Sequence, residues 1–213
     1  MTQLIKGIKF LVKERDYDMP DLKEDNFKAV NLEKPNLEKA NLEGANLERA
    51  NLEGANLEKV NLEKANLREA NLREVNLREA NLREAKLEKA NLVWAKLDKI
   101  NLEKANLERA NVEMAHFEWA KLEGADLAWA NLGKTNLEGA NLKKANLEGA
   151  NLEGALNLSI GQLSKVRSLY NVKLDEEFLI QLKEEFPLLF KSLEQQFLEY
   201  QRNFLGICVD NNL

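Results

Sequence analysis

The sequence predicts an all-β solenoid, in which the chain winds into stacked coils around a continuous apolar interior. A large apolar residue stands at every fifth position from Leu22 to Leu152, in 27 consecutive places, and only Phe27, Val112 and Phe117 are not leucine. A small or β-branched residue, usually alanine, stands two positions before each of them, and asparagine usually lies between the two. An exact short period without insertions is typical of solenoids, which present extended surfaces rather than a single cleft.

A period of five fits neither an amphipathic helix, whose apolar residues recur at i, i+3, i+4 and i+7, nor a strand that alternates every two residues. A coil with five-residue sides satisfies it, because each leucine and the alanine two positions before it then point inward while the chain turns a corner at the next two positions. Four sides give a coil of 20 residues, although the period alone does not distinguish four sides from three. The expected core includes Leu42, Leu62, Leu82, Leu102, Leu122 and Leu142.

The charged residues that follow each leucine favour four sides. Most repeats carry Glu and then Lys or Arg, but four consecutive repeats reverse this order, and their arginines are Arg68, Arg73, Arg78 and Arg83. In a 20-residue coil these repeats make one complete turn, which places Arg68 between Glu48 and Glu88. Exposed ion pairs generally contribute about 0–1 kcal/mol. We therefore predict that this ladder mainly fixes register, since slipped coils would stack like charges. The aligned asparagines are expected to hydrogen-bond from coil to coil.

The repeats resemble the pentapeptide-repeat family, whose pattern is A-(N/D)-L-x-x, over nearly two-thirds of the chain. The resemblance implies a right-handed quadrilateral β-helix, here with about seven 20-residue coils. It points to the type found in bacteria, notably cyanobacteria. It also implies an alternative function, because some members of the family inhibit or protect type II topoisomerases by mimicking DNA with a strongly acidic rod.

Both flanks of the repeats are expected to close the ends of the solenoid. We assign residues 1–15 to an N-terminal helical cap, 16–155 to the repeat β-helix and 156–213 to a C-terminal α-helical extension. One helical face of the N-terminal segment carries Leu4, Ile5, Ile8, Leu11 and Val12. At the C-terminus, helices are expected over 160–169, from 175 to near Pro187, and over about 188–204. The last helix either caps the final coil or pairs with a second copy, so we expect a monomer or a homodimer through the C-terminal helices.

Composition argues against several classes of partner. The 31 basic residues nearly balance 36 acidic ones, and the net charge of −5 is unlike that of a nucleic-acid-binding surface. No apolar run approaches the length of a membrane span. Lys6 and Lys9 interrupt the N-terminal apolar stretch, so it is a poor signal peptide. The single cysteine, Cys208, is compatible with a reducing compartment. We expect a cytoplasmic protein without a membrane or nucleic-acid partner.

The sequence offers little for catalysis. His116 is the only histidine, and Cys208 lies far from it along the chain. Neither metal-ligand spacing nor a phosphate-binding loop is evident. The glycines at the second position after leucine are expected to supply positive φ angles in turns. We therefore expect a non-enzymatic protein without catalytic residues, cofactor or metal.

Departures from the repeat gather between residues 86 and 129. Asparagine gives way to Lys86, Lys96, His116, Lys121 and Asp126. The candidate partner patch consists of Val93, Trp94, Lys96, Met114, His116 and Trp119. Trp and Met are common interface anchors and apolar patches often mark interaction sites, although scattered exposed aromatics also arise without function. The sequence thus predicts a protein–protein interaction scaffold with an unknown partner, and the alternatives are a DNA mimic that acts on a topoisomerase, a small-ligand site or a purely structural protein.

Overall fold

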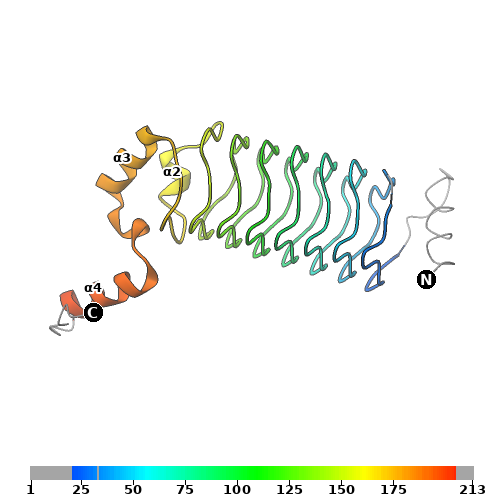
Figure 1. The fold of residues 1–213 in the computed structure, drawn as a ribbon, viewed down its shortest axis with the longest axis horizontal. Helices are drawn as coiled ribbons and strands as arrows, with labels where there is room; N and C mark the ends of the chain where they lie inside the picture. The colour runs from blue at the N-terminus through cyan, green and yellow to red at the C-terminus, as the bar shows by residue number, and fades with distance from the viewer. Residues whose placement is uncertain (1–20, 33, 205–213) are drawn as a thin grey trace.

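The computed structural model describes residues 21–204, with the exception of residue 33. It shows a rod of stacked coils followed by short helices at the C-terminal end (Figure 1). The expected N-terminal cap, residues 1–15, lies outside the described residues.

The coils have four sides. Parallel bridges join residues 20 positions apart, from Asp21↔Asn41 to Asn136↔Leu156, and one such residue occurs every five positions. We number the resulting faces by their bridge residues, so that face 1 contains Asn41, face 2 Asn46, face 3 Asn51 and face 4 Asn56, each with the residues at multiples of 20 from these. The square coil predicted from the sequence is therefore present.

The leucines and alanines fill the interior of the rod. Leu82, for example, is 0% exposed. Its N–H donates to the carbonyl of Asn101 at 2.7 Å, while the N–H of Asn81 donates to the carbonyl of Val60 at 2.9 Å. Each coil is thus joined to both neighbours through its backbone, and the apolar side chains are removed from water. The same burial is found for Leu42, Leu62, Leu82, Leu102, Leu122 and Leu142.

Asparagine is selected because one side chain satisfies three groups. The Oδ1 of Asn61 accepts from the N–H of Glu63 at 3.2 Å, which stabilises the corner, and from the Nδ2 of Asn81 at 3.2 Å. Its own Nδ2 donates to the Oδ1 of Asn41 at 3.1 Å. The predicted coil-to-coil ladder of amides is therefore confirmed along the regular part of the rod.

The expectation about glycine in the corners is only partly correct. Gly139 has a φ of +62°, but Lys59, Glu69 and Trp94 occupy equivalent corners with φ between 57° and 62°. A side chain in this left-handed region is normally unfavourable. Here the corner N–H compensates by bonding to the next coil, as that of Lys59 does to the carbonyl of Arg78 at 2.9 Å. Positive φ alone therefore does not explain where glycine occurs.

The solenoid continues beyond the last regular repeat. The helix expected over 160–169 is wrong in length, because α2 spans only Ile160–Leu163 and is capped by Ser159 and Gln162. The chain then forms an irregular further coil, in which Ser168 pairs with Asn146 and Lys173 with Asn151. This segment winds rather than lengthening the helix, and the side chains of Leu163, Leu169 and Leu174 are buried with the core.

The remaining helices follow this final coil. α3 spans Glu176–Glu185, between the N-cap residue Asp175 and Pro187, as predicted. A 3₁₀ helix, η1, covers Pro187–Phe190, and α4 covers Leu193–Phe204. The predicted start of the last helix at 188 is therefore wrong, because Ser192 and Gln195 form reciprocal hydrogen bonds that begin α4 later. α4 extends away from the end of the rod (Figure 1).

None of the helices within the described residues is both long enough and apolar enough to cross a membrane.

Candidate functional site

The structure brings five of the six predicted patch residues to one edge of face 4. Lys96 and His116 are consecutive bridge residues on this face. Trp94 and Met114, one coil apart, lie at its corner with face 3, and Val93 precedes Trp94. Trp94 is 49% exposed, whereas Val93 and Met114 are half-buried. Trp119 lies at the opposite corner of face 4, beside face 1.

Trp119 packs on the rod with one face of its indole ring. A Cβ atom at Gly139, one coil further on, would lie only 2.4–2.7 Å from three atoms of that ring. The ring therefore covers the glycine backbone, and its other face contributes to a side chain that is 59% exposed. Trp129 covers Gly149 in the same way, at 2.5–2.7 Å. Sequence reasoning missed this pairing, although a glycine 20 residues after a tryptophan was its signal.

The asparagine ladder of face 4 is interrupted at Lys96 and His116. Glu118 takes over part of its role: its Oε1 accepts from the Nδ2 of Asn136 at 2.7 Å and lies 3.4 Å from the Nδ1 of His116. The Oε2 of Glu118 is buried without a hydrogen-bond partner. Glu118 is thus a residue of this face that the sequence analysis did not select, and the signal was a carboxylate two positions after a replaced asparagine.

Glu88 shows the same arrangement on face 2, where Lys86 replaces asparagine. Its Oε1 accepts from Arg68 at 2.6 Å and from Asn106 at 3.0 Å. Desolvation raises the pKa of Glu88, but the hydrogen bond from Arg68 and the nearby positive charges outweigh it, and the pKa is lowered overall. A carboxylate can therefore replace the missing amide as the acceptor between coils.

The arginines of the reversed turn make the expected contacts in three cases. Arg68 pairs with Glu88 at 2.6 Å, Arg78 with Asp98 at 2.9 Å, and Arg83 with Glu63 at 3.4 Å. Arg73 instead lies closer to its chain neighbour Glu74, at 3.0 Å, than to Glu53 in the preceding coil, at 3.9 Å. The charges of this turn are largely neutralised within the rod.

The lysines around the patch are not neutralised in this way. In the described part of the chain, Lys96 and Lys99 form no ion pair within 4 Å, whereas neighbouring Asp98 is paired with Arg78. Glu118 is hydrogen-bonded to Asn136. Face 4 therefore combines exposed aromatic surface with unpaired positive charge. Across residues 21–204 without residue 33, no group of three or more His, Cys, Asp or Glu side chains could hold a metal ion, and Cys208 lies outside these residues.

Comparisons with known proteins agree with the repeat architecture. A family model described as pentapeptide repeats matches residues 26–63, 55–92, 65–103, 85–124 and 120–156, in eight copies. Among solved structures, the chain is similar to HetL, a pentapeptide repeat protein involved in heterocyst differentiation regulation from the cyanobacterium Nostoc sp. strain PCC 7120. The identity is 24%, the match covers 81% of this chain and 94% of that one, and the TM-score is 0.34.

Two further solved structures are similar to the chain. Trypsin-treated QnrB1, a plasmid-mediated fluoroquinolone resistance protein, is 16% identical over 76% of this chain and 96% of its own, with a TM-score of 0.39. Rfr23, a pentapeptide repeat protein from the cyanobacterium Cyanothece 51142, is 26% identical over 71% of this chain and 89% of its own, with a TM-score of 0.27. No curated protein matches the chain. Because the family model matches more than half of its residues, the protein belongs to the pentapeptide-repeat family.

Proposed function

We propose that the protein is a non-enzymatic scaffold that binds another protein through the Trp94 edge of face 4, formed by Val93, Trp94, Lys96, Met114 and His116. The observation that carries the proposal is the coincidence of two features on this edge. The asparagine ladder is given up at Lys96 and His116, and exposed aromatic surface replaces charged residues at the adjoining corner. Loss of a stabilising device where apolar surface is exposed is typical of a site kept for binding.

The charges around this edge favour a particular kind of partner. Lys96 and Lys99 have no ion pair among the described residues, while the carboxylate of Asp98 is used by Arg78. A partner segment with apolar side chains flanked by carboxylates would fill the surface between Trp94 and Met114 and pair with these lysines. Tryptophan and methionine would supply most of the binding energy, and the charges would mainly set orientation and association rate.

The test compares two variants of the full chain. Trp94→Ala with Met114→Ala removes the apolar centre of the edge, whereas Trp129→Ala removes an equally exposed tryptophan from another face. We expect wild type and Trp129→Ala to retain the same partner from a lysate of the source organism, and the double variant to lose it. The purified partner should then bind the double variant at least about tenfold more weakly, the effect of about 1.4 kcal/mol. Far-UV circular dichroism should be equal for all three.

Equal retention by the wild type and the double variant, or equal loss in both variants, would contradict the proposal. The competing function, DNA mimicry towards a type II topoisomerase, requires a continuous acidic surface. Pairs such as Arg49 with Glu69 at 2.8 Å and Arg78 with Asp98 at 2.9 Å interrupt such a surface. It predicts inhibition or protection of gyrase in a supercoiling assay, and that result together with an inactive Trp94 edge would favour it over the scaffold.

A further inference from the structure

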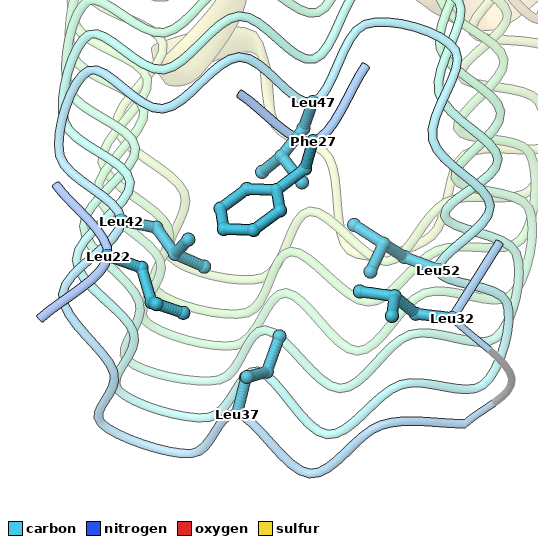
Figure 2. A pocket seen from close by; sticks show the side chains of 7 residues that line it. All are labelled: Leu22, Phe27, Leu32, Leu37, Leu42, Leu47 and Leu52. Carbon is cyan, nitrogen blue, oxygen red and sulfur yellow. The ribbon is translucent and has the colours of Figure 1, made fainter. Parts of the chain in front are cut away.

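The two ends of the rod are closed differently. At the C-terminal end, the irregular coil and α3 place Leu163, Leu169 and Leu182 over the interior, and all three are 0% exposed. At the N-terminal end, Leu22, Phe27, Leu32 and Leu37 surround an apolar pocket of about 250 Å³, which continues between the leucines of the following coil (Figure 2). The residues that line this pocket are all leucine or phenylalanine.

The backbone at this rim is also incomplete. One coil further in, the N–H groups of Asn46 and Asn51 donate to the carbonyls of Asp25 and Val30, each at 2.8 Å. The equivalent N–H groups of Asn26 and Asn31 have no acceptor among the described residues. An apolar pocket bordered by unpaired backbone groups invites association with another segment or another copy.

We propose that residues 4–12 of the same chain cover this rim and insert apolar side chains into the pocket. The segment leads directly into the first coil. Eight residues separate Val12 from Asp21 and reach about 30 Å when extended, enough to return across a rim whose sides are five residues long. Leu4, Ile5, Ile8, Leu11 and Val12 fall on one helical face, which matches the purely apolar lining.

Charge complementarity favours this occupant over a second copy of the rim. In the described part of the chain, the rim residues Glu24 and Asp25 form no ion pair, and only Lys34 offers an unpaired opposite charge. Two such rims facing each other would bring their unpaired carboxylates together. Lys6, Lys9 and Lys13, which alternate with the apolar residues of the segment, supply the positive charges that the rim lacks.

The proposal is tested with the full chain. A spin label is attached to Gln3→Cys in a Cys208→Ser background, and leucine methyl signals are recorded by NMR. We expect Leu22 and Leu37 to be strongly broadened and Leu152, at the far end, to be unaffected. Broadening must persist on dilution, and a mixture of spin-labelled chain with isotope-labelled, unmodified chain must show none. Unaffected rim signals would overturn the proposal, and broadening that occurs in the mixture would assign the rim to a second copy instead.

A second measurement uses the apolar face directly. Ile8→Asp with Leu11→Asp should increase the binding of an apolar fluorescent dye several-fold and promote self-association in light scattering, with unchanged far-UV circular dichroism. Lys6→Gln with Lys9→Gln is the matched control and should leave dye binding near the wild-type value. Equal dye binding by both variants would contradict the insertion of Ile8 and Leu11 into the pocket.

Discussion

The reversed turn, residues 66–85, and the interrupted stretch, residues 86–129, are built on the same interior but carry different surfaces. In both, the leucines are buried and backbone hydrogen bonds of 2.7–3.2 Å join each coil to the next. The reversed turn keeps asparagine in every repeat and pairs its arginines within the rod. The interrupted stretch loses four asparagines to Lys or His and carries all three tryptophans. The comparison shows that backbone and core hold the coil, so the outer positions are free to change.

The largest expected effect tests whether the two interiors are equivalent. Leu82→Ala in the reversed turn and Leu97→Ala in the interrupted stretch each remove a side chain that is 0% exposed. Both should reduce the free energy of unfolding by about 2–5 kcal/mol, since lost transfer energy and a cavity add. Equilibrium denaturation followed by circular dichroism measures this, and the exposed Leu188→Ala should change little. A much smaller loss for Leu97→Ala would show that the interrupted stretch is packed differently.

The next effect concerns the tryptophans that distinguish the interrupted stretch. Gly139→Ala would place a methyl group within 2.7 Å of the Trp119 ring, and we expect a loss of about 1–3 kcal/mol from overpacking. Gly124→Ala is the matched control, because its φ is +69° and its methyl group would meet Lys104 at an ordinary 3.7 Å.

A double-mutant cycle separates contact from backbone strain at this site. In a Trp119→Ser background, Gly139→Ala should cost no more than Gly124→Ala does in the wild type. If the penalty persists without the tryptophan, the left-handed backbone rather than the ring selects glycine at this corner.

The third effect exchanges the surfaces of the two regions. Asn71→Ala removes amide hydrogen bonds to Asn51 at 3.0 Å and to Glu53 at 3.1 Å and should cost about 1–2 kcal/mol. Lys96→Asn with His116→Asn should restore the ladder of face 4 and gain about 1 kcal/mol, measured by the denaturation midpoint. The same double variant should bind the partner less well. A loss of stability on restoring asparagine would mean that Lys96 and His116 are themselves stabilising.

The regular architecture could be predicted because every repeat contributes the same evidence. The period of five located the core, and the reversed arginines fixed 20 residues per coil. The irregular coil after 155 was missed because α2 replaces one side and shifts the pairing, so that Ser168 lies 22 residues from Asn146. Leu169 and Leu174, five positions apart, were the remaining signal. Outside the regular repeats, a local capping signal at Ser159 did not reveal how far the helix would continue.

The candidate site was less predictable than the fold. Columns of 20 residues place Trp94 beside Met114, because position along the coil depends only on backbone period. The use of Glu118 between His116 and Asn136 depends on side-chain conformation, which no period encodes. The ring of Trp119 likewise turns towards Gly139 because only glycine leaves room for it. Contacts of this kind require coordinates, although the residues that make them can be suspected from the columns.

The smallest expected effect compares a paired and an unpaired cation. Arg68→Gln should lower the denaturation midpoint slightly, because Arg68 donates to Glu88 at 2.6 Å, whereas Lys96→Gln should leave it unchanged. The pKa of Glu88 is lowered in the folded protein, so its contribution is present above its unfolded value of about 4.3. It should disappear as pH falls through the lowered folded pKa. The Arg68→Gln deficit should therefore be measurable at pH 7, decline below pH 4.3 and shrink in 1 M salt. A deficit that is independent of pH and salt would assign the role of Arg68 to packing of its aliphatic stem rather than to charge.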